Sequence, residues 1–308
     1  MSETKLPATT SGSLYALGAF LAWGLFPIYW KFLGAFPALE LIAYRVVLSF
    51  LFYWFLARRN GSSLFGWLDL FRETRQGLAI VAATAMISTN WLLYVWAVNS
   101  DHVVDASLGY FITPLLNVLM GSLLLKERLN RARWIAIALA TAGVLVLAVQ
   151  GGTFPWIATS IALTFSIYGL IRKQLKSDVF ETSTAETAVI FVPALLYAIY
   201  IRGFDPTAHS AAVLEATLIL FGGVVTGIPL IWFAQAARRL PLSSLAFFQY
   251  IAPSLQFLLG VFAYGEPFNL AKLQAFILIW IALAIFSFDS YRSRPLRAMR
   301  ALRTRERL

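Results

Sequence analysis

The sequence predicts an all-α integral membrane protein with ten transmembrane helices, arranged as two inverted five-helix repeats. Three observations predict this fold class: a composition too apolar for a soluble domain, ten apolar segments of bilayer-spanning length, and two stretches in opposite halves that align with each other. Of the 308 residues, 59% are hydrophobic and 13% are charged, whereas a soluble domain usually carries about 25% charged residues. The chain therefore has too little polar surface for a soluble globule of this size.

Each apolar segment falls within the range of about 17–25 residues that a helix needs to cross the hydrocarbon core of a bilayer. The connections between the segments are too short to hold a folded soluble domain. The first segment is interpreted as a retained helix rather than a signal peptide, because Phe32 and Phe36 leave no small-residue cleavage site. In chain order the predicted spans are 13–33, 38–57, 77–98, 104–125, 133–150, 154–171, 185–201, 213–236, 242–264 and 271–289.

The basic residues of the connections lie almost entirely in the even-numbered ones and in the two termini. The odd-numbered connections carry only Lys31, Arg202 and Lys272. Because Lys and Arg beside helix ends favour the cytoplasmic side, this pattern predicts a multi-pass protein of the cell inner membrane with both termini cytoplasmic. The formal net charge of +10 then reflects topology, and no nucleic-acid partner is expected. The basic C-terminal tail either anchors this topology in solvent or binds anionic lipid.

The two halves of the chain repeat each other. Residues 112–132 align without a gap with residues 251–271, so the fourth and ninth spans look like copies. In a weaker match of the first and sixth spans, Lys31 aligns with Lys173; the two fall on opposite sides of the membrane, which predicts inverted copies. Such repeats typically enclose a substrate site at their interface. The predicted division is a cytoplasmic N-terminus (1–12), a first repeat (13–150), a second repeat (151–289) and a basic cytoplasmic tail (290–308).

Polar residues follow one face of the fourth span and the matching positions of the ninth. In the fourth span they are Tyr110, Pro114 and Asn117, and in the ninth they are Gln249, Pro253 and Gln256. Because an amide facing lipid lacks partners, Asn117 and Gln256 are expected to face the protein interior or a water-filled cavity. Each proline is expected to free a backbone carbonyl and kink its helix. These residues are candidates for the substrate path; alternatively, the amides only join helices and the prolines only shape them.

Ionisable side chains within the spans are rarer and are functional candidates by default. Glu40 and Arg45 lie about 140° apart around the second span, so Arg45 is expected to find a partner other than Glu40. Glu40 and Glu186 either carry protons in coupled transport or cap a helix start, where a carboxylate favours the dipole; capping is the preferred interpretation. Asn90 and Tyr94 share a face of the third span and complete the set of candidates.

The sequence lacks the residue patterns of several kinds of catalytic, nucleotide-binding and metal sites. There is no cysteine, so neither a disulfide nor a cysteine-ligated metal is available. The sequence holds no GxxxxGK[ST] loop for ATP phosphates, no HExxH and no GxSxG. His102 and His209 fall in predicted outward-facing connections. We therefore expect no enzyme activity, no cofactor and no metal site.

Five stretches spread over both halves match a known family pattern. They are NWLLYVWAVN (90–99), ASLGYFITPL (106–115), KERL (126–129), YGLIRK (168–173) and FAQAARRLPLSSLAFFQYIAP (233–253). Together they resemble the RarD branch of the EamA, or drug/metabolite transporter, superfamily, over nearly the whole chain. The resemblance implies an inner-membrane permease with ten helices in two inverted EamA-type repeats, in a group named for chloramphenicol sensitivity.

The predicted function is secondary transport of a small organic metabolite or drug, with export as one option, by alternating access between two five-helix bundles. The expected partners are this small molecule and the lipid bilayer, with proton coupling as an option. Two alternatives stay open: an uncoupled facilitator of the same fold, and a membrane sensor or scaffold that transports nothing. The inward-facing polar groups favour transport over the scaffold.

Overall fold

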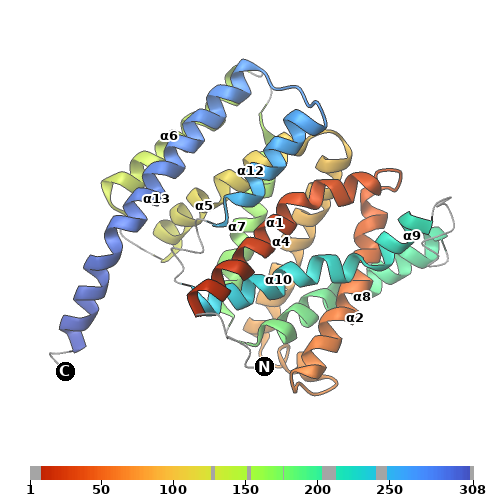
Figure 1. The fold of residues 1–308 in the computed structure, drawn as a ribbon. Helices are drawn as coiled ribbons and strands as arrows, with labels where there is room; N and C mark the ends of the chain where they lie inside the picture. The colour runs from red at the N-terminus through yellow and green to blue at the C-terminus, as the bar shows by residue number, and fades with distance from the viewer. Residues whose placement is uncertain are drawn as a thin grey trace, which may run out of the picture.

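The computed structural model describes residues 8–125, 129–150, 154–175, 177–202, 213–240 and 248–305, and every regular element in these ranges is a helix (Figure 1). In the first half the helices are α1 (Ala8–Phe32), α2 (Ala38–Arg59), the one-turn α3 (Gly66–Asp69), α4 (Thr74–Asn99), α5 (Val103–Leu125) and α6 (Arg131–Gln150). In the second half they are α7 (Trp156–Gln174), α8 (Val179–Arg202), α9 (Val213–Leu220), α10 (Gly222–Arg239), α12 (Ile251–Leu258), the π-helix η1 (Leu259–Ala263) and α13 (Leu270–Arg305).

Six of these helices are long and apolar enough to cross a membrane, or seven if the bent pair α9 and α10 forms one span. Two further helices, at 156–172 and 251–263, are apolar but shorter. The prediction of an all-α membrane fold is therefore confirmed within the described residues. The last apolar span ends at Asp289, but α13 continues to Arg305, so the predicted tail begins as an extension of a helix.

The eighth and ninth predicted spans differ from single helices. The eighth is broken between Leu220 and Gly222 by a bend of 45°, since two consecutive glycines have low helix propensity. The ninth begins, within the described residues, only at Phe248, because residues 241–247 lie outside them. Pro253 is the third residue of α12, where its missing N–H disrupts nothing. Gln249 lies in the turn directly before α12. Whether Pro253 kinks a longer ninth span depends on residues 241–247, so the predicted kink stays a prediction.

Helices from opposite halves of the sequence form most of the interhelical contacts. The principal packed pairs are α6 with α13, α2 with α8, α5 with α7, α1 with α10, α4 with α7, α1 with α12, α2 with α10 and α5 with α12. Figure 1 shows α6 and α13 running side by side along one edge of the molecule. Glycine allows close crossings: a Cβ on Gly109 of α5 would lie 2.7 Å from the Ala158 carbonyl oxygen of α7.

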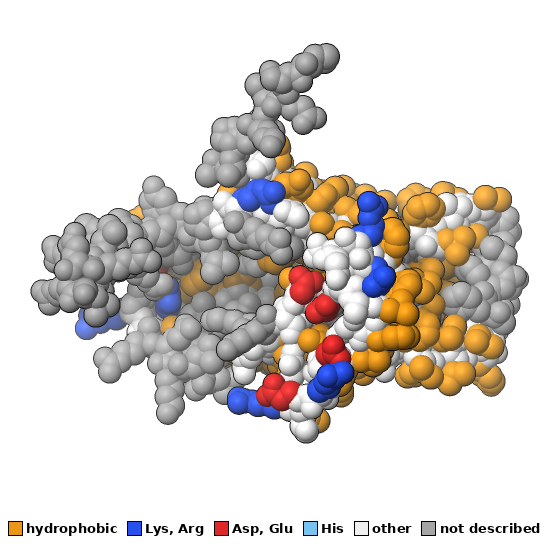
Figure 2. Space-filling view, turned by 90° about the horizontal axis from the view of Figure 1, so that it is seen from below, with side chains coloured by type: hydrophobic (Ala, Val, Ile, Leu, Met, Phe, Trp, Pro, Cys, Tyr) orange, Lys and Arg blue, Asp and Glu red, His pale blue; other side chains and the backbone are white. Residues whose placement is uncertain are grey.

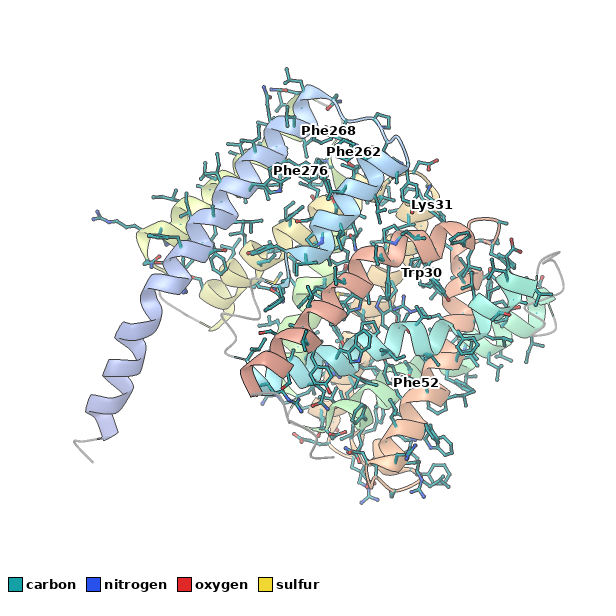
Figure 3. The ribbon with its side chains drawn as sticks, in the orientation of Figure 1. Trp30, Lys31, Phe52, Phe262, Phe268 and Phe276 are labelled. Atoms are coloured by element: carbon teal, nitrogen blue, oxygen red, sulfur yellow. The ribbon has the colours of Figure 1, made fainter. Side chains whose placement is uncertain are left out.

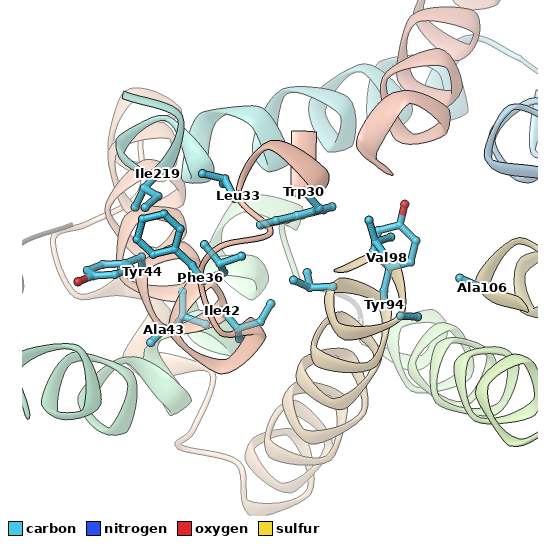
Figure 4. Packing of buried hydrophobic residues seen from close by; sticks show 14 of the residues in the cluster. Trp30, Leu33, Phe36, Ile42, Ala43, Tyr44, Tyr94, Val98, Ala106 and Ile219 are labelled. Atoms are coloured by element: carbon cyan, nitrogen blue, oxygen red, sulfur yellow. The ribbon is translucent and has the colours of Figure 1, made fainter. Parts of the chain in front are cut away.

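Two large hydrophobic clusters hold the helices together. One gathers residues of α1, α2 and α4, including Trp30, Tyr44 and Tyr94 (Figure 4). The other joins α5, α6, α7 and α13 around Phe276, and Figure 3 shows Phe268 and Phe276 beside α13, away from Trp30 of α1. Large apolar side chains also remain exposed on many helices, as expected where lipid rather than water surrounds the protein.

Polar contacts join the helix ends in two separate groups. The first group links the ends of α1, α4 and α5 to the first turn of α13: Lys31 pairs with Asp101, and Lys272 Nζ lies 3.1 Å from Asp105 Oδ1. The second group joins the opposite helix ends, through Arg133 Nε and Asp289 Oδ2 at 3.2 Å and through Gln76 Nε2 and Ser177 Oγ at 2.6 Å. Figure 2 shows acidic and basic side chains gathered on one face, flanked by hydrophobic ones.

Glu266 fixes the start of α5 from the other half of the chain. Its two carboxylate oxygens accept hydrogen bonds from the backbone N–H groups of Val103 (2.6 Å) and Val104 (2.8 Å), and the side chain is buried. A carboxylate at a helix N-terminus satisfies free N–H groups and favours the dipole. Residue 266 thus acts as a cap supplied in space rather than in sequence.

We expect Glu266→Gln to lower the free energy of unfolding by about 1–3 kcal/mol, because one N–H loses its charged acceptor. Unfolding by dodecyl sulfate in mixed micelles measures this change. Glu73→Gln is the matched control: Glu73 precedes α4 at the N-cap position but its side chain makes no capping bond, so little change is expected. Equal effects of the two substitutions would contradict the capping role of Glu266.

Candidate functional site

Arg45 is a buried cation whose neighbours are aromatic. It lies on α2 with 6% of its surface exposed, and its guanidinium carbon is 4.0 Å from the ring centroid of Trp91 on α4 and 5.6 Å from that of Trp30 on α1. Such cation–π contacts stabilise a desolvated guanidinium. The partners that the structure gives the Arg45 guanidinium are thus two aromatic rings from other helices.

Three hydrogen-bond donors near Arg45 have no acceptor among the described residues. They are Arg45 Nε, the indole Nε1 of Trp30 and the hydroxyl of Tyr94, all three shielded from solvent. Trp30 and Tyr94 belong to the same packed cluster (Figure 4). Arg45 and Trp30 also line one small pocket, together with Tyr29, Leu33, Leu41, Tyr44, Ile219 and Gly222. A buried polar group without a partner is costly, so this cluster is a candidate binding site for an acceptor.

Asn90, Tyr94 and Tyr110 lie together at the junction of α4, α5 and α7. The amide nitrogen of Asn90 donates to the Ile161 carbonyl oxygen (2.9 Å) and to Thr164 Oγ1 (3.0 Å), and its amide oxygen accepts from the Tyr110 hydroxyl (3.3 Å). The rings of Tyr94 and Tyr110 meet edge to face, with centroids 5.7 Å apart. The structure thus brings these three predicted residues into one network, which fixes α5 against α4 and α7.

The amides at matching positions of α5 and α12 have different environments. Gln256 is buried, and its Nε2 donates to the Trp23 carbonyl oxygen at 3.0 Å. Asn117 is exposed, whereas Pro114 and Gln249 are half-buried. Gln256 therefore faces the protein interior, as expected. Asn117 is not packed in the interior, so for this residue the water-filled cavity stays the prediction. Gln256 joins α12 to α1, as the alternative interpretation predicts.

The two glutamates occupy different positions on their helices. Glu40 lies in the first turn of α2 and is 1% exposed, where a carboxylate favours the helix dipole. Glu186 does not lie at a helix start, because α8 begins at Val179, and the capping interpretation of Glu186 is therefore wrong. Its carboxylate accepts hydrogen bonds from Arg172 Nη1 (3.1 Å) and the Tyr168 hydroxyl (3.3 Å).

Sequence reasoning missed four residues of these two clusters: Trp30, Trp91, Tyr168 and Arg172. Tyr168 and Arg172 stand at positions i and i+4 of one helix face, a spacing that could have indicated a shared polar partner. Trp91 follows Asn90 directly, but no spacing rule connects it to Arg45 on another helix. Among the described residues, no group of three His, Cys, Asp or Glu side chains could hold a metal ion, and His209 lies outside them.

Comparison with known proteins agrees with this membrane architecture. The model of the EamA-like transporter family matches residues 10–149. The chain is 43% identical to the protein RarD of Streptomyces exfoliatus over 290 residues, which cover 92% of this chain and 90% of that protein. The chain belongs to the RarD family. The protein RarD of Escherichia coli K12 is 40% identical over 284 residues, covering 92% of this RarD-family chain and 95% of that protein.

One solved crystal structure shares the fold of this chain. Its TM-score is 0.58 with 21% sequence identity, over 91% of this chain and 99% of the other. Membership of the RarD family makes this chain a member of a membrane transporter family with several apolar helices. Arg45 and its aromatic neighbours lie in the first half, within the region that the family model matches.

Proposed function

We propose that this RarD-family chain is a secondary transporter that moves a small organic metabolite or drug across the cell inner membrane by alternating access. One observation supports it most: the principal contacts between the two halves map onto one another when the halves are exchanged. If α1, α2, α4, α5 and α6 correspond to α7, α8, α9 with α10, α12 and α13, then α2–α8, α5–α12 and α6–α13 map onto themselves. Of the other principal contacts between the halves, α1–α10, α1–α12 and α2–α10 map onto α7–α4, α7–α5 and α8–α4.

This exchange symmetry supports two five-helix repeats, residues 13–150 and 151–289, around a pseudo-two-fold axis. The helix inventory agrees with ten spans: six candidate spans, the bent pair, the two shorter apolar helices and the 23-residue α5. Two bundles related by such an axis can pack against each other in two equivalent arrangements. That property is the structural basis of alternating access in transporters with inverted repeats.

The separate polar groups at the helix ends support the proposed topology. At one end, three contacts join segments that the charge pattern assigns to the outside. They are the pairs Lys31–Asp101 and Lys272–Asp105 and the hydrogen bond from Val103 N–H to Glu266. The contacts of Arg133 with Asp289 and of Gln76 with Ser177 join segments assigned to the cytoplasm. Since none of these contacts joins segments assigned to opposite sides, both termini are proposed to be cytoplasmic.

The candidate substrate path runs between α1, α2, α4 and α5, where Arg45, Asn90, Tyr94 and Tyr110 lie. We expect Tyr110→Phe to lower transport about threefold to tenfold, because it removes the partly buried hydrogen bond to Asn90 while keeping the ring. Purified protein in liposomes loaded with a metabolite and drug panel, amphenicols included, measures exchange of labelled compounds. Tyr200→Phe is the matched control, because Tyr200 is 87% exposed, and it should transport at the wild-type rate.

A protonophore added to the same liposomes separates coupled transport from an uncoupled facilitator. Loss of accumulation with retained exchange indicates proton coupling, and an unchanged gradient indicates a facilitator. No flux of any compound in the panel, with folded and correctly inserted protein, would contradict the proposed transport function and favour the sensor or scaffold.

A further inference from the structure

We propose that Arg45 binds a carboxylate group of the transported compound, so that the substrate is a small organic anion with an apolar body. This inference rests on the proposed transport function. Its starting point is the set of donors around Arg45: the guanidinium Nε and the Trp30 indole N–H are buried and find no acceptor among the described residues.

The contacts of Arg45 satisfy its charge only in part. Trp91 and Trp30 offer their ring faces to the guanidinium, and a face interacts with the charge but accepts no conventional hydrogen bond from the N–H groups. A guanidinium stays protonated at any physiological pH, and its fork of donors matches the two oxygens of a carboxylate. A bound carboxylate would therefore supply the acceptor that the Arg45 Nε and the Trp30 indole N–H lack.

The N-terminal end of helix α10 lies at the same pocket. Gly222, the first residue of α10, lines the pocket with Arg45, and the bend of 45° between α9 and α10 falls just before it. The N-terminal end of a helix carries partial positive charge, and broken helices in transporters direct such ends towards anionic substrate groups. A Cβ on Gly222 would lie 3.3 Å from the Tyr29 hydroxyl, so the glycine also keeps this space open.

The remaining walls suit an apolar body rather than a second charge. Leu33, Leu41 and Ile219 line the pocket beside the aromatic rings of Tyr29 and Trp30. The pocket measures about 10 Å³ in this arrangement, roughly the space that one water molecule needs. A substrate therefore enters only when the helices separate, and the break between α9 and α10 lies where such a movement would open the pocket.

The test compares three compounds of the same shape but different charge: 3-phenylpropionate, 3-phenylpropionamide and 3-phenylpropylammonium. Thermal unfolding of the purified full-length protein measures binding, because a ligand stabilises the state that it binds. We expect the anion to raise the unfolding temperature and the other two to leave it unchanged. Arg45→Gln should weaken binding of the anion about tenfold or more, since charged hydrogen bonds are lost. Arg58→Gln, which removes an exposed arginine, should bind like the wild type.

A second variant keeps the proposal testable where Arg45→Gln does not fold. Gly222→Ala retains the guanidinium but narrows the pocket, and it should also weaken binding of the anion. Equal stabilisation by the amide and the anion, or anion binding unchanged by both substitutions, would overturn the proposal.

Flux in liposomes separates this inference from the transport function. If the wild type takes up the anion and Arg45→Gln abolishes this uptake, both the carboxylate site and the transport function are supported. Uptake of neutral or cationic compounds, with no binding of the anion, overturns the carboxylate site and leaves the transport function standing. Stabilisation by the anion with no flux of any compound supports the binding site and contradicts the transport function.

Discussion

Arg172→Met is expected to lower the free energy of unfolding by about 3–5 kcal/mol, the usual cost of removing one partner from a buried ion pair. Arg172 Nη1 lies 3.1 Å from Glu186 Oε1, and the two side chains are 21% and 7% exposed. The substitution leaves the more buried partner, the Glu186 carboxylate, with only the Tyr168 hydroxyl as a donor. Dodecyl sulfate unfolding in mixed micelles measures the loss.

The reverse substitution is expected to cost less. In Glu186→Gln the amide oxygen still accepts from Arg172, and the partly exposed guanidinium can reach water. The double variant Arg172→Met with Glu186→Leu should recover much of the loss, because no unpaired charge remains.

The surface pair of Arg72 and Asp69, at 3.0 Å with side chains 82% and 59% exposed, provides the control. Arg72→Met should change stability by less than about 1 kcal/mol. If Arg172→Met proved as mild as Arg72→Met, the pair with Glu186 would have no structural role.

The pair also bears on proton coupling. A glutamate that releases protons during transport must change its partners between states, whereas Glu186 is held by Arg172 and Tyr168 in this arrangement. Both donors come from α7 and Glu186 from α8. Movement of α7 against α8 would therefore separate the two ions.

The helices themselves could be predicted because a bilayer imposes length and composition on each span. The ends of α2, α4 and α6 fall within a few residues of the predicted limits. The break at Gly222 was not predicted, since two glycines in an apolar run indicate either close packing or a break, and only the approach of α2 distinguishes the two. Close packing does occur at the next residue, Gly223, because the backbone of Leu48 lies against it.

The sequence identifies single candidate residues of the site but not the residues that they contact. Arg45 is evident as a rare charge in an apolar span, and Asn90, Tyr94 and Tyr110 as polar groups on helix faces. The contacts between Arg45 and Trp91 depend on how α2 lies against α4, and no periodicity within one helix encodes that arrangement. Asn117 shows what helical spacing alone cannot predict. The spacing identifies which residues share one face of a helix, but not which neighbouring helix covers that face.

Gly223→Ala is expected to destabilise the protein by about 1–3 kcal/mol through overpacking of α10 against α2. A Cβ at this position would lie 2.5 Å from the carbonyl oxygen of Leu48, 2.6 Å from its carbon and 2.9 Å from the backbone nitrogen of Ser49. These are main-chain atoms of a helix, so no rotamer change can relieve the contact, and α2 and α10 must move apart. Such close approach of backbones through small residues is a principal source of helix association in membranes.

Gly169→Ala is the matched control, because Gly169 lies within α7 and its added Cβ would meet nothing within 4 Å. Alanine is the better helix former by about 0.5–1 kcal/mol, so this variant should be as stable as the wild type or slightly more stable. If the two glycine-to-alanine substitutions change stability in opposite directions, the effect at Gly223 comes from the contact between α10 and α2 and not from helix propensity. Because α10 begins beside Arg45, separating α2 from α10 should also lower transport, whereas equal stability of the two variants would contradict the close crossing.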